Sequence, residues 1–509
     1  MSIELTKTDI GTAEVLYDNF AEQGIDCDIS LPDYCPDIMR ILRCSVTNSI
    51  TNSKISGDRA TVDGNAKIRI VYADDKNGIY CYEQDYPFSK FSELPQTYDG
   101  AVLCSSAKTE YANCRAVSKK RIDIHGVVSI RFKIVGIKNE SVITDAEGDG
   151  IQLRKKKIGT DSVAAVVMKK FQLSQTEEAD GGEIGKIFYA CASPVLSETK
   201  IIKGKILLKG EAVLKVMYCS ATGENESVCV NYNLPFSEII DIESIDDSCK
   251  VSVGFNVDQV QAEPKTDNDG EYKYLNLGCD ICAVVTAYKT EDICVITDSY
   301  STQKEIDAKY KTETFTQILQ NLNDSIICRE SVDLSSMNPQ RIYAAIAQSP
   351  EAKSRFDADK MTVTGKIPLK FILIDGEGTP TFCEREAEFE YSRSIDAKGG
   401  NLHCDPKLFL TGYSCTLTSD GRAEFKAEMN ISADITETSE CRTLVSLKTM
   451  ENSELKKRHS SLVICFCNGG EKIWDIARKY NTTVEDIMSE NELTSDEISE
   501  KMMLMIPVK

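Results

Sequence analysis

The sequence has few residues of the kinds that most catalytic sites use. Only three histidines occur among 509 residues, and none lies in a metalloprotease, cysteine-nucleophile or serine-elbow motif. The glycines of Gly182–Gly185 are too close together for a phosphate-binding loop, and the acidic turn Asp267–Gly270 lacks the later ligands of a calcium loop. The sequence therefore predicts a protein that is not an enzyme, with no catalytic residues, no metal site and no cofactor.

Long hydrophobic runs and an excess of basic charge are also missing. The longest apolar runs, such as Val163–Met168, fall far short of the roughly 20 residues of a membrane-spanning helix. The N-terminus lacks the basic start and apolar core of a signal peptide, so we expect the chain to stay in the compartment where it is made. The 80 acidic and 59 basic residues argue against nucleic acid or an anionic membrane as the main partner. Two basic runs, Arg154–Lys157 and Lys456–Arg458, are interpreted as solvated loop charges.

The 20 cysteines have scattered positions. In a reducing compartment we expect free thiols that are mostly buried as small apolar residues. Cys279 and Cys282 have metal-ligand spacing, but they lie in a strand pattern, where positions three apart point to opposite faces. Cys465 and Cys467 share a face but have no neighbouring histidine or aspartate to complete a zinc site. Both pairs are predicted to be structural, and later cross-linking stays open.

One pattern occurs three times in the chain. The segments RATVDGNAKIRIVY (59–72), KILLKGEAVLKVMY (205–218) and KMTVTGKIPLKFIL (360–373) alternate in the same phase around Gly64, Gly210 and Gly365. Such alternation predicts a half-buried strand, with the glycine at a bend or bulge. The repeat extends upstream to Ile41, Ile187 and Ile342, and downstream to YPFSK (86–90), LPFSE (234–238) and EYSRS (390–394). A further alternating strand follows each copy, at 121–135, 275–288 and 421–435.

The repeat predicts a mainly β protein with three tandem antiparallel modules of sandwich or barrel-like packing. The predicted boundaries are 1–145, 146–292 and 293–445, with a polar linker at 446–459 and a last domain at 460–509. Pro368 suggests an edge position for the strand of the third copy. Short helices are expected before each main strand, with Pro36 in the first turn of one and Asn338–Pro339 starting another.

The last 50 residues have a different pattern. SLVICFC reads as a strand, Asn468–Gly470 as a turn, and IWDIARKY (473–480) has helical spacing. Thr482 or Thr483 can cap a second helix, VEDIMSEN, and Met503–Val508 returns as a strand. This β-α-α-β order, with its helix wording and the ending Leu504–Pro507, resembles a LysM domain.

The LysM resemblance includes two departures from the family pattern. LysM domains that bind N-acetylglucosamine chains do so in a shallow groove between two loops. Here Lys472 replaces the small hydroxyl residue of the first loop, and Ser499–Lys501 lacks the usual proline-glycine of the second. Trp474 is expected to pack the helix onto the sheet instead of stacking on sugar.

Nearly the whole chain is similar to a known family of sporulation proteins. LPDYCPDIMRIL (31–42), the YPFS and LPFS strand ends and the terminal LysM together resemble clostridial spore-coat proteins of the SipL type, which carry SPOCS domains. The resemblance implies three SPOCS modules and a non-enzymatic coat-assembly factor in the mother-cell cytoplasm, at the forespore surface. It also implies docking of the LysM domain to a coat ATPase of the SpoIVA type. Other coat proteins or self-association are further partners, and the ligand of each SPOCS module stays open.

Two functions remain for the tail. The alternative to protein docking is attachment to peptidoglycan or cortex through N-acetylglucosamine. A solvated helix face explains the same side chains equally well. The residues predicted to contact a partner or a glycan lie on the LysM loops and helices: Gly470, Glu471, Lys472, Arg478, Lys479, Tyr480, Glu485 and Asn491.

Overall fold

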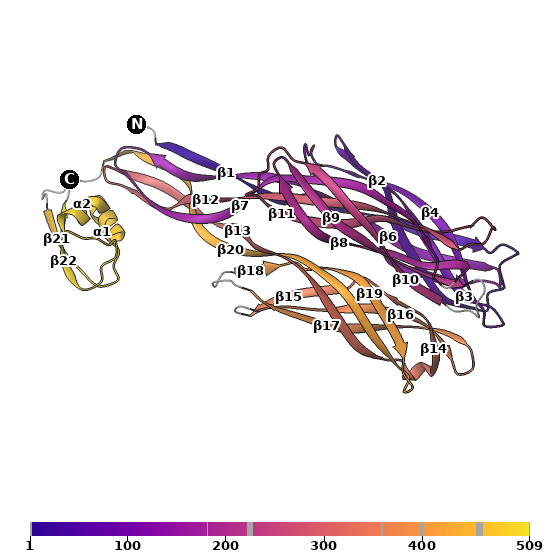
Figure 1. The fold of residues 1–509 in the computed structure, drawn as a ribbon. Coiled ribbons are helices and arrows are strands. Elements are labelled where there is room, and N and C mark those ends of the chain that lie inside the picture. The colour runs from indigo at the N-terminus through magenta and orange to yellow at the C-terminus, as the bar shows by residue number, and fades with distance from the viewer. Residues whose placement is uncertain are drawn as a thin grey trace.

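A computed structural model describes residues 3–180, 182–220, 227–357, 360–395, 401–454 and 462–507, and the side chains of all of these except 451–454. Antiparallel strands form nearly all of the regular structure, which confirms the predicted mainly β fold. Figure 1 shows a body of packed sheets, a stalk of long strands that leaves the body, and a small domain with two helices beyond the end of the stalk. None of the described helices is long and apolar enough to cross a membrane.

The described strands of the body form three consecutive modules. The first contains β1 (Glu4–Ser30), β2 (Arg40–Ser56), β3 (Arg59–Ala73), β4 (Ile79–Glu93), β5 (Val102–Ala116) and β6 (Arg121–Glu147). The second contains β7 (Ile151–Glu178), β8 (Ile184–Ile202), β9 (Lys205–Ser220), β10 (Ser227–Asp241), β11 (Lys250–Lys265) and β12 (Tyr274–Ser301). The third contains β13 (Lys304–Asp333), the 3₁₀ helix η1 (Ser335–Met337), β14 (Pro339–Ala347), β15 (Glu351–Asp357), β16 (Lys360–Asp375), β17 (Pro380–Ser394), β18 (Asn401–Cys404), β19 (Lys407–Leu417) and β20 (Arg422–Glu454).

Each module has the same two sheets. A short sheet has the repeated strand at its centre, in the orders β2-β3-β4, β8-β9-β10 and β14/β15-β16-β17. A long sheet has the last strand at its centre, in the orders β1-β6-β5, β7-β12-β11 and β13-β20-β18/β19. The third module differs because two of its strands are each divided into two pieces. Apolar side chains of both sheets meet in each module's core, so each module is a β-sandwich.

A phenylalanine packed on the shared glycine recurs in every short sheet. Phe88 pairs with Gly64, Phe236 with Gly210 and Phe389 with Gly365. A Cβ at Gly210 would lie 2.6 Å from Phe236 Cζ and would also clash with the Val195 carbonyl. The neighbouring strand shifts register beside Gly64 and Gly210, in agreement with the predicted bulge. The register also places Ile41, Ile187 and Ile342 at equivalent positions, opposite Tyr72, Tyr218 and Leu373. In the third copy the structural counterpart of the YPFSK phenylalanine is Phe389, three residues before the position that the EYSRS match implied.

The first and last strands of each module run beyond its sandwich as a paired arm. The arms pair 4–15 with 135–147, 151–161 with 290–301, and 304–314 with 440–454. Together the three arms form the stalk (Figure 1). Its apolar interior takes side chains from all three modules: Ile10, Val142, Ile143, Ala146, Ile158, Ile293, Val295, Ile296, Phe315, Cys441, Leu444 and Leu447.

The short sheets of the three modules meet at a second shared core. Leu42, Phe188 and Tyr343 occupy the same place relative to the shared glycine, and all three lie in this core. Val71, Met217 and Ile372 are a second such set. Because equivalent positions meet, the modules are arranged around an approximate threefold axis. The protein is therefore one assembly of three modules and not a flexible chain of beads.

The predicted module boundaries fall within strands. Residue 145 lies in β6, 292 in β12 and 445 in β20, because the last strand of each module continues into the stalk. Part of the predicted linker 446–459 belongs to β20, and residues 455–459, with His459 and the basic run Lys456–Arg458, lie outside the described residues. The basic run Arg154–Lys157 was predicted to be a loop, which is wrong: it lies in β7, where Lys155 pairs with Asp145 and Lys157 with Asp292.

The helices expected before the main strands are wrong. In the first module the segment after β1 is held by the loop before β6, through Leu31 N–H to Lys120 O (2.8 Å) and Ile38 N–H to Lys119 O (2.8 Å). A turn at Pro32–Cys35 replaces the helix. In the third module Asn338 has a left-handed backbone (φ 44°) and ends η1, so Pro339 begins a strand. Tertiary hydrogen bonds override the local helix signal in the first case.

The edge position predicted from Pro368 is also wrong, since β16 is the central strand of its sheet. The carbonyl of Pro368 accepts from Gln348 N–H (2.9 Å), in the gap between β14 and β15. The N–H and C=O of a strand residue point to the same side, so the missing donor faces this interruption.

We expect Gly210→Ala to destabilise the protein by about 1–3 kcal/mol, because the new methyl group overpacks against Phe236 and the Val195 carbonyl. Gly24→Ala is the matched control, since a Cβ at this strand position meets nothing within 4 Å. Urea denaturation followed by circular dichroism measures both. Equal midpoints for the two variants would contradict the close approach.

A second prediction concerns Lys215, which is 3% exposed and lies between the second and third modules. Its Nζ is 3.3 Å from the centre of the Tyr413 ring and has no hydrogen-bond acceptor among the described residues. Burial lowers the pKa of Lys215 to about 8, against roughly 10.4 for an unfolded lysine. Between these values the unfolded chain binds the proton more tightly, so this group makes stability rise with pH from about 8 to 10.4. Denaturation midpoints should show a smaller rise in Lys215→Met than in the wild type; identical pH profiles would contradict this.

The C-terminal domain as candidate functional site

The C-terminal domain has the predicted β-α-α-β order. It contains β21 (Leu462–Cys467), α1 (Ile473–Tyr480), α2 (Val484–Glu490) and β22 (Met502–Pro507), with β21 and β22 antiparallel. Thr483 is the cap of α2, since its Oγ1 accepts from Asp486 N–H (3.0 Å). Asn481, with a left-handed backbone (φ 54°), ends α1. The helices pack on the inner face of the two strands around a small apolar core.

Trp474 is a packing residue, as predicted, but its partner was not predicted. The indole is 7% exposed and lies edge-to-face with Tyr300 of β12, with ring centroids 4.9 Å apart. Tyr300 belongs to the same core as Ile473 and Ala477. Burial, with the nearby Asp298 carboxylate, raises the pKa of Tyr300, which keeps its hydroxyl protonated. That hydroxyl donates to the Thr482 carbonyl at 2.8 Å.

Asp298, also on β12, holds the same helix from the side. Its carboxylate accepts from Trp474 Nε1–H at 2.9 Å and from Arg478 Nη1 at 2.8 and 3.0 Å. The aspartate side chain is mostly buried. A charge-assisted bond to a mostly buried carboxylate is stronger than a neutral one. The domain is therefore seated on the end of the stalk through one face of α1.

The two loops that would border a sugar groove are bonded to each other. Gly470 N–H donates to Ile498 O (2.7 Å), Ile498 N–H to Glu471 O (3.0 Å), and Ile473 N–H to Asp496 O (2.9 Å). These backbone groups already have partners within the domain. A sugar with many hydroxyls needs convergent polar groups that are still available.

The predicted contact residues divide into three groups. Gly470, Glu471 and Lys472 lie on the bonded loops, and Lys472 precedes α1 as its cap position. Arg478 is bonded to Asp298, and the side chains of Lys479 and Glu485 are exposed. Tyr480 packs against the domain core, and Asn491 hydrogen-bonds both backbone groups of Met505 at 2.7 Å. Arg478 and Asn491 are therefore already engaged within the protein, whereas Lys479 and Glu485 are open to solvent.

The sequence reasoning missed an apolar outer face on the two strands. Leu462, Ile464 and Phe466 of β21 and Met503 and Met505 of β22 are between 38% and 73% exposed. The signal was in the sequence, because LVICFC and MMLMIP are apolar at both alternating positions. A strand with one wet face ordinarily alternates.

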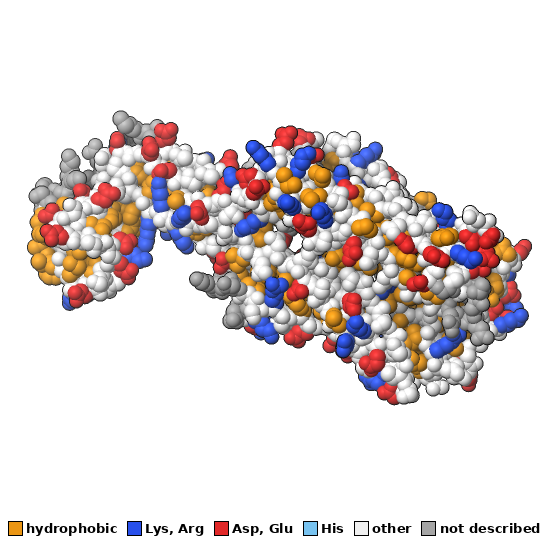
Figure 2. Space-filling view, in the orientation of Figure 1, with side chains coloured by type: hydrophobic (Ala, Val, Ile, Leu, Met, Phe, Trp, Pro, Cys, Tyr) orange, Lys and Arg blue, Asp and Glu red, His pale blue; other side chains and the backbone are white. Residues whose placement is uncertain are grey.

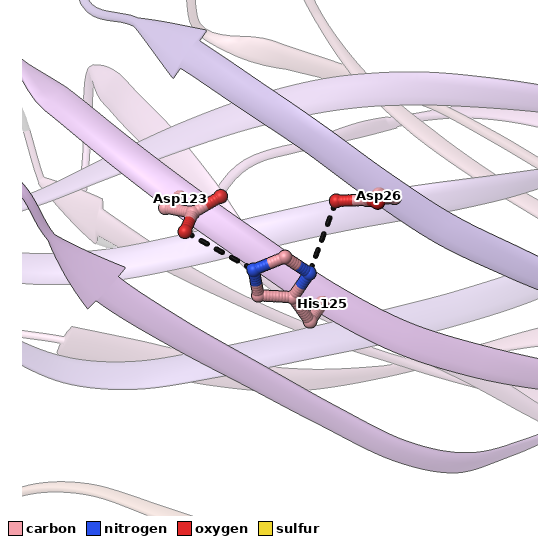
Figure 3. A group of neighbouring side chains, drawn as sticks. All are labelled: Asp26, Asp123 and His125. Carbon is pink, nitrogen blue, oxygen red and sulfur yellow. Dashed lines mark hydrogen bonds and ion pairs between the residues drawn. The ribbon is translucent and has the colours of Figure 1, made fainter.

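One group of potential metal-ligating residues occurs within the described part of the chain, at Asp26, Asp123 and His125 (Figure 3). His125 is exposed, as predicted from its outward strand position. Its Nδ1 lies 3.0 Å from Asp26 and its Nε2 lies 3.1 Å from Asp123. The carboxylates face opposite edges of the ring, so they bond the imidazole instead of converging with it on one point. The predicted structural thiols Cys465 and Cys467 have sulfurs 3.6 Å apart, and Cys279 and Cys282 are both buried in β12.

Two protein-family models match the chain. "SipL, SPOCS domain" matches residues 37–117 and 183–265, and "LysM domain" matches residues 470–507. The chain has the domain architecture of the SipL type. The first match covers β2 to β5 and the second covers β8 to β11, one in each of the first two modules. No curated protein and no solved structure matched the chain.

The SipL-type architecture fits a coat-associated protein of sporulation that carries a LysM module. SPOCS and LysM domains are non-catalytic binding domains. The third module has the strand order of the two matched SPOCS modules, although neither match extends to it. The stalk strands β1, β6, β7 and β12 also lie outside the SPOCS matches.

Removal of the Asp298 carboxylate should loosen the LysM domain from the stalk. Asp298→Ala leaves the indole N–H and Arg478 without this acceptor, and we expect a loss of about 1–3 kcal/mol in the seating free energy. Trp474 is the only tryptophan, so its emission should move to longer wavelength and iodide should quench it more strongly. Asp292→Ala is the control on the same strand, since in the described part of the chain Asp292 forms an exposed ion pair with Lys157. Unchanged quenching in Asp298→Ala would contradict the seating.

Proposed function

We propose that this protein is a non-enzymatic assembly factor of the spore coat, acting in the mother-cell cytoplasm at the forespore surface. Its LysM domain docks a coat ATPase of the SpoIVA type, and its three modules and stalk hold that domain at one end of a long scaffold. The observation that carries the proposal is the state of the LysM domain. The loop backbone groups and the tryptophan that would bind a sugar are bonded or packed within the protein, whereas an apolar face of the domain is exposed.

Three observations favour a protein partner over a glycan. The backbone groups of the two groove loops bond each other. Trp474, at the start of the helix that follows the first loop, is buried against Tyr300 and bonded to Asp298, so its ring is not free to stack on a sugar. The LysM strands carry no charged residue, and their outer face offers apolar area of the kind found at the centre of protein interfaces.

The three modules suit a spacer. Their strands bury apolar side chains within and between modules, and the interior of the stalk is shared by all three. The proposed module limits are accordingly 4–147, 151–301 and 304–454, which keep each strand whole.

Calorimetric titration of the full chain tests this function. We expect saturable binding to purified coat ATPase of the SpoIVA type and no heat with soluble N-acetylglucosamine oligomers. A chain ending at Glu454 is the control that assigns the binding to the LysM domain, and it should not bind. Saturable sugar binding without binding to the ATPase would contradict the proposal and place the protein on peptidoglycan or cortex.

A further inference from the structure

The outer face of the LysM sheet is a contiguous apolar surface. We call it the outer face and define it by Leu462, Ile464, Phe466, Met503 and Met505. The strand register places Ile464 opposite Met505 and Phe466 opposite Met503, so these side chains are direct cross-strand neighbours. Figure 2 shows hydrophobic side chains gathered over the part of the domain where Figure 1 places β21 and β22.

The inner face of the same strands already accounts for the fold of the domain. Cys467, Leu504 and Ile506 are buried against the helices, and alternation sends their neighbours outward. Nothing in the domain's own packing requires Phe466 or Met503 to be apolar. Exposed apolar patches of this kind mark interaction sites in proteins that are otherwise polar on the surface.

Two other surfaces of the domain are engaged within the protein. One side of α1 is bonded to Asp298 and packed on Tyr300. At the outer edge of β22, Asn491 accepts from the Met505 N–H and donates to the Met505 carbonyl, so strand addition is blocked there. A partner therefore meets the outer face itself and not that strand edge. Because the stalk holds the helix side, the outer face points away from the modules (Figure 1).

The charge around the outer face indicates the kind of partner. Residues 462–507 contain nine acidic and four basic side chains, while β21 and β22 contain none. The acidic side chains around the outer face repel a second copy of the chain, because each chain carries a net charge of −21. They repel an anionic lipid surface for the same reason. The outer face and its acidic surroundings are complementary to a folded protein surface with an apolar centre and a basic rim.

We infer that the outer face is the surface through which the LysM domain binds its protein partner, and that the partner presents an apolar patch rimmed by lysine or arginine. This inference rests on the proposed function and names the surface and the partner chemistry of the same domain. Phe466 and Ile464 lie at the centre of the contact, where aromatic and large aliphatic side chains carry most of the binding energy.

Full-length Ile464→Ser/Phe466→Ser tests the surface, with purified coat ATPase of the SpoIVA type as the probe in biolayer interferometry. Ile239→Ser is the matched control, because Ile239 is an exposed aliphatic residue on β10 of the second module. We expect the double variant to lose about 100-fold or more in affinity and the control to stay within about twofold. Wild-type binding should weaken from low to high salt, as a basic rim requires. Unchanged Trp474 emission shows that the double variant keeps its seated fold.

The outcomes separate the surface from the function. Wild-type binding that the double variant retains overturns the outer face as the site while leaving the proposed function in place. Absence of wild-type binding overturns both. Sedimentation of the chain alone and flotation with phosphatidylglycerol vesicles complete the test: self-association or vesicle binding that the double variant abolishes, with ATPase binding intact, overturns the stated partner chemistry.

Discussion

The arms that form the stalk have no core until they meet. Each is a two-stranded ribbon, and such a ribbon is marginal in water because it cannot bury one of its faces. Three ribbons together enclose the shared interior around Val142, Val295 and Leu444, so the arms stabilise one another and hold the three modules in one orientation. The short connections at 148–150 and 302–303 meet at the same end, where Thr302 N–H donates to the Gly150 carbonyl. The seat of the LysM domain depends on this joint, because Tyr300 and Asp298 lie on the stalk strand β12.

The LysM domain keeps its fold while its polar and aromatic groups are used within the protein. The backbone donors that would line a sugar groove are hydrogen-bonded between the two loops. Trp474 is packed against Tyr300 and hydrogen-bonded to Asp298. The stalk therefore supplies part of the core of the small domain, because Tyr300 of β12 packs among the apolar residues of the domain. The same contact fixes the direction in which the two strands face, so the outer face is presented by a rigid support.

Much of the fold could be predicted because the spacing of apolar residues along the chain differs between strands and helices. Alternation around Gly64, Gly210 and Gly365 identified the central strands, and helical spacing in 473–480 identified α1. The stalk could not be predicted, because its strands carry mixed side chains such as the Arg154–Lys157 run, and their apolar residues gain meaning only beside two other arms. The helix expected at Pro36 is absent because Leu31 and Ile38 hydrogen-bond a loop more than 80 residues later in the chain, which no local sequence pattern indicates. In the site, charged residues such as Arg478 were predicted to contact a partner because of their residue type. The sequence does not show that Arg478 bonds an aspartate 180 residues earlier in the chain.

Time-resolved anisotropy of Trp474 in the full chain tests most directly whether the LysM domain is seated on the stalk. This tryptophan lies at the interface itself, so its depolarisation reports the motion of the small domain relative to the modules. The account predicts one slow correlation time, that of the whole particle. A dominant fast component, as expected for a domain of about 50 residues moving on a flexible tether, would contradict it.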